Sequence, residues 1–390
     1  MRYDAVIIGA GPAGSAAARL LAQANWNVAL VEKAVFPRRK VCGEFISAPT
    51  MPVLKACGVA VPFISAAGPL VTRIGAYAGS GMLATPREQA WGRALGREHL
   101  DTLLRDAAIA AGVTLFQPAE VTALRPQDDE QLCVLDDGSE IAGRIVIAAC
   151  GSWNTKGVFA IAEGKPASSD LFAFKAHFTQ SALPPGLMPL LAFPGGYGGL
   201  VESDGGRVSL SCCIRRDTLS KVRGRRGGKA GEAVLAHIMA TTKGARLALG
   251  NAVLDGNILA TGPIHPGIRA TAHNNGAHDD NVFFTGNIAG EAHPVIAEGI
   301  SMAIQSSGLL AKLLIAHRGE LYAREWKQRF ASRIRAASLF AHLAMSGGGR
   351  LAGRAMLGAA PSLLGLGARF SGKGPDAREL SSSQSSAFLL

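Results

Sequence analysis

The sequence predicts an α/β fold: a Rossmann-type domain assembled from separated segments, with an inserted antiparallel-sheet domain and helices at the C-terminal end. Three observations predict it. Near the N-terminus, an apolar strand passes through a glycine-rich turn into a helix. From about Leu171 to Leu259, short strands alternate with glycine-rich turns. The chain has 390 residues, which is too long for one ordinary core, so a second domain is expected.

The first segment, VIIGAGPAGSAAARLL at residues 6–21, is open to three interpretations: a secretion signal, a membrane span, or a cradle for a nucleotide phosphate. The apolar run is shorter than the roughly 18 residues of a membrane span. Asp4 interrupts the basic start that a signal needs. The order of strand, glycines and helix is one that a signal does not require. We therefore expect a dinucleotide site here.

Each glycine of the GxGxxG turn has a role in that site. Gly9 allows the tight turn, Gly11 lets a pyrophosphate approach the backbone, and Gly14 lets the helix pack closely on the strand. The helix N-terminus, which includes Pro12 and Ala13, offers a partial positive charge and free N–H groups to a phosphate.

A second strand at residues 27–33 ends at Glu32, 18 residues after Gly14. A carboxylate at this position can accept hydrogen bonds from a ribose and would repel a 2′-phosphate. A lone GxGxxG is a weak signal, but strand, glycines, helix, strand and terminal acid together are a strong one. Lys33 follows directly and is counted among the binding residues.

The remaining elements follow in order along the chain. Residues 96–116 predict a helix and then a strand, and residues 144–150 predict a buried strand after a hairpin turn at Asp137-Gly138. Residues 281–287 bring back the parallel-strand pattern, and a helix follows. The predicted units are the cofactor-binding domain (1–75, 96–155 and 270–320), the substrate domain (76–95 and 156–269), the C-terminal helical region (321–378) and a flexible tail (379–390).

Residues 283–304 read FFTGNIAGEAHPVIAEGISMAI. This stretch resembles the second FAD motif of the flavoprotein family that includes aromatic-ring hydroxylases, flavin halogenases and geranylgeranyl reductases. KVCGEFIS at residues 40–47 is similar to a segment of the geranylgeranyl-reductase branch, and Arg97 matches an arginine that the family uses near the FAD pyrophosphate. The resemblance implies FAD as the cofactor. It places in the cofactor site Lys40, Cys42, Arg97, Val121, Gly286, Asn287, Gly299, Ile300 and Ser301.

The second motif has implied roles and one substitution. The N–H groups around Gly299, Ile300 and Ser301 begin a helix and would point at the flavin N1 and C2 carbonyl. Asn287 stands where the family has an Asp that accepts hydrogen bonds from the ribityl chain, and its amide carbonyl is still an acceptor.

Two further departures from the family bear on the reaction. Cys150-Gly151 stands where hydroxylases of the family have an Asp-Gly pair tied to FAD and NAD(P)H, which argues against direct use of NAD(P)H. NADPH and NADH are kept as candidate electron donors. The halogenase motif Trp-x-Trp-x-Ile-Pro is absent from the sequence, so halogenation is not expected.

Three residues are candidate proton donors or orienting groups: Glu44, His293 and Glu298. For each, the alternative is a capping or structural hydrogen bond. Cys42 could lie near the flavin ring or be a buried, inert thiol. FPGGYGGL at residues 193–200 is expected over the substrate space, with Tyr197 as a polar handle, or as a plain hairpin turn.

The formal net charge is +11, and two basic runs, residues 215–229 and 312–378, carry much of it. Such runs suit nucleic acid, anionic lipid or acidic substrates, or form a solvated face. No aromatic residues interleave with them in a recognisable motif, so nucleic acid is not expected as a partner. The C-terminal helices, with RIRAASLFAHLAM at residues 333–345, could contact a membrane surface or simply cover the cofactor domain.

The six cysteines form no CxxC pair, which predicts neither a zinc site nor a thioredoxin-type motif. Their usage fits a reducing compartment, so a cytoplasmic location is expected.

These observations predict an FAD-dependent oxidoreductase with an apolar small-molecule substrate. Two reactions stay open: hydroxylation or epoxidation of a polyketide- or isoprenoid-like molecule by a monooxygenase, and reduction of carbon–carbon double bonds as in geranylgeranyl reductases. Oxygen consumption coupled to turnover separates them. A third hypothesis, a non-enzymatic module for nucleic acid or membrane, predicts salt-sensitive binding that survives destruction of the FAD site.

Overall fold

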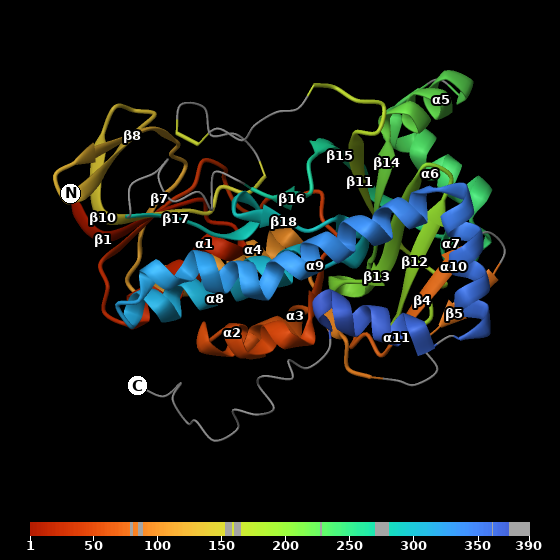
Figure 1. Cartoon of the computed structure of the whole chain (residues 1–390), viewed down its shortest axis with the longest axis horizontal. Coiled ribbons are helices and arrows are strands. Elements are labelled where there is room, and N and C mark those ends of the chain that lie inside the picture. The colour runs from red at the N-terminus through yellow and green to blue at the C-terminus, as the bar shows by residue number, and fades with distance from the viewer. Residues whose placement is uncertain are drawn as a thin grey trace.

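The computed structural model describes residues 1–78, 81–84, 89–152, 158–159, 165–226, 228–269, 281–360 and 362–373. Within them, two large sheets lie at opposite ends of an elongated molecule, and helices pack against both (Figure 1). The predicted α/β class is confirmed. The predicted tail at residues 379–390 lies outside the described residues.

The first sheet has the strand order β7-β2-β1-β10-β9-β8, and β17 pairs with the C-terminal half of β10. The central strands are parallel, and Val6, Ile7 and Ile147 are fully buried, as expected for apolar strands covered on both faces. The predicted hairpin turn at Asp137-Gly138 joins β9 to β10. The strands are β1 (Arg2–Ile8), β2 (Val28–Val31), β7 (Thr114–Phe116), β8 (Val121–Gln127), β9 (Glu130–Leu135), β10 (Glu140–Ala148) and β17 (Val282–Phe284).

Helix α1 follows β1 and packs against both α4 and α8. The small residues of α1, such as Ala16 and Ala17, are fully buried, which permits this close packing. The helices of this part are α1 (Pro12–Gln23), α2 (Met51–Ala56), α3 (Ala60–Ala66), α4 (Arg97–Ala110) and α8 (Gly299–Ile315).

The second sheet has the order β15-β11-β14-β13-β12-β4-β5. Its pairs are antiparallel, as predicted for residues 171–259, except that β12 pairs with β4 in parallel. β4 begins at Arg73, so the boundary predicted after residue 75 falls inside a strand of the second sheet. The strands are β4 (Arg73–Ala78), β5 (Gly81–Ala84), β11 (Leu171–Thr179), β12 (Leu187–Phe193), β13 (Gly196–Glu202), β14 (Val208–Arg215) and β15 (Val253–Ile264).

Helices interrupt the predicted run of strands between β14 and β15. The basic run at residues 215–229 is mostly helical, and apolar residues of the next helix, Val234 and Ile238, are buried in one core with Phe174 and Phe178 of the sheet. These helices cover one face of the second sheet. They are α5 (Arg216–Arg226), α6 (Ala230–Thr241) and α7 (Lys243–Leu249).

Two small sheets connect the large ones. β6 (Gly92–Ala94) pairs with β3 (Phe45–Ser47), so this part of the segment predicted for the substrate domain belongs with the cofactor segment instead. β16 (Gly267–Ile268) pairs with β18 (Gly290–Glu291). Short helical turns include η3 (Gly286–Ile288) and η4 (Pro294–Ile296).

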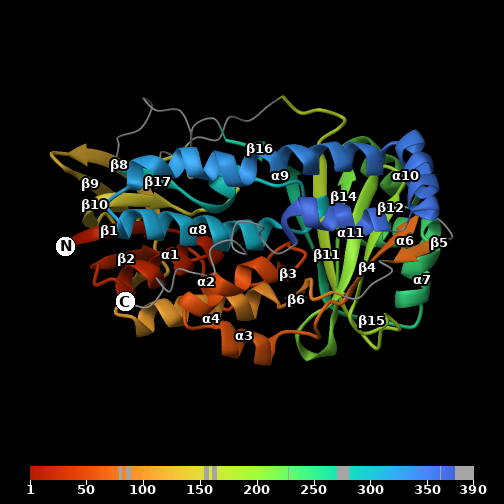
Figure 2. The same cartoon turned by 60° about the horizontal axis from the view of Figure 1, so that its bottom comes forward.

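The C-terminal helices run back over the molecule. α9 (Tyr322–Met345) lies beside α8 and reaches the second sheet, where it contacts β12 and β13. α10 (Gly347–Ala359), α11 (Ser362–Ala368) and a turn at Arg369–Lys373 follow at that end of the molecule (Figure 2). No helix among the described residues has the length and apolarity needed to cross a bilayer.

Candidate functional site

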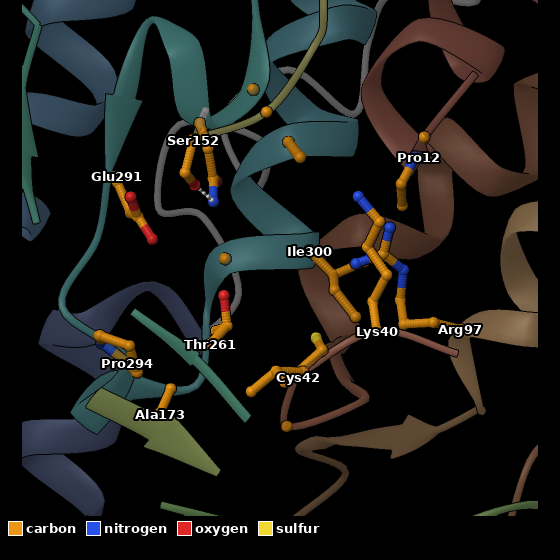
Figure 3. Close-up of a pocket in the computed structure, with 18 of the residues that line it drawn as sticks. Pro12, Lys40, Cys42, Arg97, Ser152, Ala173, Thr261, Glu291, Pro294 and Ile300 are labelled. Carbon is orange, nitrogen blue, oxygen red and sulfur yellow. Dashed lines mark hydrogen bonds between the residues drawn. The ribbon is translucent and has the colours of Figure 1, made fainter. Parts of the chain in front are cut away.

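One cavity of about 420 Å³ extends from the N-terminus of α1 to the second sheet. Figure 3 shows Pro12, Lys40 and Arg97 on one side and Ala173, Pro294 and Glu291 on the other, with Cys42 and Ile300 between them. The cavity therefore joins the glycine-rich turn to the inserted domain.

The turn from β1 into α1 forms a backbone cradle at the first end. Gly9 has a φ of +104°, and a Cβ on Gly14 would lie 1.9 Å from the Gly9 carbonyl oxygen, so only glycine fits there. Gly11 is the N-cap residue of α1. Because it has no side chain, no capping hydrogen bond covers the N–H groups of the first turn. The nearest atom to a Cβ on Gly11 would be Arg97 Nη2, at 3.9 Å. Gly9, Gly11, Pro12 and Ala13 all line the cavity, so the exposed N–H groups form an anion site.

Glu32, which follows β2, is hydrogen-bonded to the backbone of this cradle. Its Oε2 accepts a hydrogen bond from the Ala10 N–H at 2.9 Å and lies 3.2 Å from Arg38 Nη2. Its Oε1 accepts a hydrogen bond from the Ala34 N–H at 2.8 Å. A carboxylate has about four acceptor positions, so about one is left for a ribose hydroxyl. Glu32 also lines the cavity.

Three cations, Arg38, Lys40 and Arg97, face the same end of the cavity. Arg97 is fixed by two hydrogen bonds to the Asp101 carboxylate, of 2.6 and 2.8 Å. Burial and the nearby guanidinium groups of Arg38 and Arg97 lower the pKa of Lys40 to about 8. Lys33, by contrast, is exposed and pairs with Glu120 at the rim.

The predicted second motif meets this cavity from the opposite side. Gly286, Asn287, Gly299 and Ile300 line it, and Asn287 Nδ2 donates a hydrogen bond to Ser152 Oγ at 3.0 Å (Figure 3). Helix α8 begins there, again without a side-chain cap. Its first-turn N–H groups can therefore stabilise negative charge in the cavity.

Three other predicted cofactor residues have different positions. Val121 is buried and lines the cavity. Cys42 lines it as well, and its sulfur lies 3.5 Å from the Glu44 nitrogen. The side chain of Ser301 points elsewhere, because its hydroxyl accepts a hydrogen bond from the Ser47 N–H at 2.9 Å.

Glu44 is fully buried beside two basic side chains of β11. It is bonded to Lys175, and His177 Nε2 lies 2.9 Å from its Oε2. Burial alone would raise the pKa of Glu44, but the His177 hydrogen bond and the Lys175 charge outweigh it and lower the pKa to about 2. Glu44 is therefore an ionised link to the second sheet and is not suited to donate a proton.

Glu298 has the contacts of the structural alternative. Its carboxylate accepts a hydrogen bond from Ser47 Oγ at 2.9 Å and lies 3.0 Å from Lys373 Nζ, away from the cavity lining. It is a structural group that holds the C-terminal turn.

His293 does not line the cavity itself but contacts Tyr197, which does. Its Nδ1 lies 2.5 Å from the hydroxyl of Tyr197, which lines the cavity. Burial lowers the pKa of His293 to about 4, so the imidazole is neutral at pH 7. The two rings can orient each other and a polar group of a ligand. Tyr197 lies in β13 and not in the turn before it.

Sequence reasoning missed a further carboxylate of the cavity, Glu291 on β18. It lines the cavity and is 3.0 Å from Arg269 Nη2. Burial raises the pKa of Glu291 in spite of the Arg269 charge. Its place inside the second motif, shortly before Glu298, is the signal that could have found it. Lys175 and His177 were missed too, although two basic residues at alternate positions of an apolar strand are such a signal.

The end of the cavity at the second sheet is mainly apolar. Aliphatic side chains of β12 and β13 form its wall, together with the two cysteines of β14. Polar groups are few, which suits an apolar ligand with one or two fixed hydrogen bonds. The lining here comprises Ala173, Met188, Leu190, Tyr197, Leu200, Val201, Ser211, Cys212, Cys213, Thr261 and Ile264.

Comparison with known proteins identifies the cofactor end of this cavity. Residues 2–157 match the family model described as an FAD binding domain. This match supports FAD as the cofactor at the glycine-rich turn. The FAD domain is also 29% identical, over 153 residues, to the menaquinone reductase of Mycobacterium tuberculosis, and 30% identical, over 160 residues, to that of Mycolicibacterium smegmatis. These matches cover 38% and 39% of the relatives' own lengths.

Solved structures resemble the chain beyond its FAD domain. The flavin-dependent brominase Bmp2 has a TM-score of 0.74 at 19% identity, over 98% of this chain and 92% of that one. PqsL of Pseudomonas aeruginosa, solved with 2-aminobenzoylacetate, has a TM-score of 0.68 at 18% identity, over 90% and 98%. At these identities the likeness shows the fold alone, which this chain shares with both structures.

The residues of the cavity fit FAD. The α1 cradle with Arg38, Lys40 and Arg97 would hold the pyrophosphate, and Glu32 the adenosine ribose. Asn287 would contact the ribityl chain. The α8 N-terminus would face the flavin ring, where reduced flavin gathers negative charge. The replacement of Asp by Asn at residue 287 leaves an acceptor in place, because its Nδ2 is already bonded to Ser152.

The pKa of Lys40 makes FAD affinity depend on pH. Its ammonium attracts the pyrophosphate and is lost as pH rises through about 8, so we expect affinity to fall between pH 7 and pH 9. Lys40→Met should weaken FAD binding about 10-fold at pH 7 and flatten this pH dependence. Titration of apoprotein with FAD, followed by flavin fluorescence, measures both. Lys55→Met is the matched control, because this exposed lysine of α2 lies outside the cavity lining. A wild-type affinity that is constant from pH 7 to 9 would contradict the assignment.

Proposed function

We propose that the protein is an FAD-dependent monooxygenase that hydroxylates or epoxidises an apolar small molecule. The observation that carries this proposal is the single cavity, with an FAD cradle at one end and an apolar wall at the other. Bound FAD, once reduced by NADPH or NADH, would supply two electrons, either to oxygen or, as a hydride, to a carbon–carbon double bond.

The residues at the second sheet support an apolar substrate. Met188, Leu190 and Leu200 exclude water from the space beside the α8 N-terminus. The Tyr197 hydroxyl, held by His293, provides a hydrogen bond that can orient one polar group, such as a phenol or carbonyl. A polyketide- or isoprenoid-like molecule has this combination of apolar bulk and a single polar end.

The proposed reaction uses NADPH or NADH as the electron donor, and oxygen uptake tests it. The FAD-loaded protein is reduced anaerobically with each nucleotide and then mixed with oxygen and a panel of prenylated and polyketide phenols. The monooxygenase proposal predicts that one oxygen is consumed for each product and that the product gains one oxygen atom in mass. Product that gains two hydrogens without oxygen uptake would contradict it.

Reduction of a double bond is the second candidate, and Glu291 is the observation that favours it. Such a reduction needs a proton as well as a hydride, and burial raises the pKa of this cavity carboxyl, which favours its protonated form. The name of the mycobacterial relatives, menaquinone reductase, supports a reductase in the same fold.

Glu291→Gln separates the two candidates. If Glu291 is the proton donor of a reductase, the substitution should lower kcat by about 10²- to 10⁴-fold while FAD stays bound. If the protein is a monooxygenase, kcat should change by less than about 10-fold, because the amide keeps the shape and a hydrogen bond to Arg269. Glu120→Gln, an exposed carboxylate at the cavity rim, is the control for loss of negative charge.

A further inference from the structure

The end of the described chain packs behind the wall of the cavity. Ala368 of α11 is buried in one core with Met188 and Val201, which line the apolar end. Lys373 donates a hydrogen bond to the Ile296 carbonyl and pairs with Glu298 at the start of α8. We call residues 346–360 and 362–373 the C-terminal arm. Its inner side is thus fixed beside the substrate part of the cavity.

The outer side of the arm, together with the end of α9, is apolar and exposed. No residue of α10 is buried, although the helix carries leucine and methionine. Of the 18 large apolar residues that are exposed in the described part of the chain, eight lie between residues 339 and 370. They are Leu339, Phe340, Leu343, Leu351, Met356, Leu363, Leu366 and Phe370. Such a concentration is unusual on a surface that meets only water.

The same stretch is purely cationic. Residues 332–373 contain six Lys and Arg residues and no Asp or Glu. Arg350 and Arg369 are hydrogen-bonded only to neutral oxygens, those of Met345 and Gln89. Among the described residues, no carboxylate neutralises them or Arg354. The exposed apolar side chains therefore lie among guanidinium groups that pair with no carboxylate of the described part of the chain.

We propose that the C-terminal arm and the end of α9 dock on an anionic lipid bilayer. Apolar side chains that enter the acyl boundary, with arginines at the level of the phosphates, are the composition of helices that lie in a membrane interface. Nucleic acid would use the arginines but leave the leucines in water. A spanning helix does not fit, because α10 has only 13 residues.

This surface has a consequence for the substrate, which rests on the proposed function. The arm that touches the lipid also packs behind the apolar end of the cavity, because Ala368 shares a core with Met188 and Val201 of the cavity lining. Figures 1 and 2 show α11 beside β4. An apolar substrate dissolved in the bilayer would then lie next to the space where it reacts. The substrate class would be membrane-soluble lipids.

Flotation with vesicles tests the docking surface without any turnover, so its result does not depend on the reaction. Full-length, FAD-loaded protein is mixed with vesicles of phosphatidylcholine alone or with about 30% phosphatidylglycerol, and the bound fraction is measured. We expect binding to the anionic vesicles only. Arg350→Gln with Arg354→Gln should weaken it about 30-fold, and Leu351→Ser with Met356→Ser by at least about 10-fold.

Leu247→Ser is the matched control, because this exposed leucine lies on α7, outside the arm. FAD content and thermal midpoint establish that each variant is folded. The proposal is overturned if wild-type protein does not float with anionic vesicles, or if the arm variants bind as tightly as wild type. Flotation of a protein that turns over no substrate would contradict the proposed function and leave the docking surface supported.

Discussion

Gly11→Val abolishes FAD binding while the chain stays folded: this is the largest effect that we expect. The φ of Gly11 is −72°, which valine adopts readily, and the space where its Cβ would lie has no protein atom nearer than 3.9 Å. The added side chain therefore enters the space where the pyrophosphate must approach the backbone. We expect a loss of FAD affinity of at least about 100-fold.

The measurement is FAD titration of apoprotein, with circular dichroism and urea unfolding as tests of the fold. Gly353→Val is the matched control, since a Cβ on Gly353 of α10 would have no atom within 4 Å and this glycine is not part of the cavity lining. FAD binding by Gly11→Val with near wild-type affinity would show that the pyrophosphate does not lie over this turn.

Glu44→Gln is expected to lower the free energy of unfolding by about 3–5 kcal/mol, because it leaves the Lys175 ammonium buried without a counter-charge. Lys175→Met should destabilise for the converse reason. The double variant Glu44→Gln/Lys175→Met should lose about 2 kcal/mol less than the sum of the single variants, since it buries neither charge unpaired. Urea unfolding of the four proteins measures this coupling.

The exposed pair Lys33–Glu120 is the control for this cycle. Its N–O distance is 2.9 Å, but its side chains are 61% and 40% exposed. The corresponding cycle with Lys33→Met and Glu120→Gln should give less than about 1 kcal/mol of coupling. Equal coupling in the two cycles would mean that the Glu44 pair does not hold the second sheet to the FAD domain.

The cluster of Glu44, Lys175 and His177 also predicts how the free energy of unfolding depends on pH. The pKa of Glu44 is lowered in the folded chain, from an ordinary value of 4.5 to about 2. Its contribution is therefore complete above about pH 5 and is lost as pH falls towards 2, because the unfolded chain binds the proton more readily. Glu44→Gln should remove part of this slope.

The parts of the site that sequence predicts are local. Gly9, Gly11, Gly14 and Glu32 lie in one strand–helix–strand unit, so their spacing alone determines that they meet. The same holds for Gly286 and Gly299 of the second motif. Gly286 begins the turn η3, and Gly299 begins helix α8. Their roles required no knowledge of distant contacts.

The contacts that sequence could not predict join residues that are distant in the chain. Glu44 gained its buried partners from Lys175 and His177, and Glu298 gained Lys373, across two domains. Whether an acid of the second motif faces the cavity depends on the direction of the chain before α8, which placed Glu291 in the wall and Glu298 outside it. Helix α6 was not predicted because its apolar residues form no evident helical stripe in the sequence. They are buried because they pack against the second sheet.

The measurement that tests the central claim most directly is the visible absorption spectrum of the purified protein after incubation with excess FAD and gel filtration. The account predicts a bound flavin that is released on denaturation as FAD, at one per chain. A protein that stays colourless would contradict the claim that this cavity is an FAD site, and both candidate reactions would fall with it.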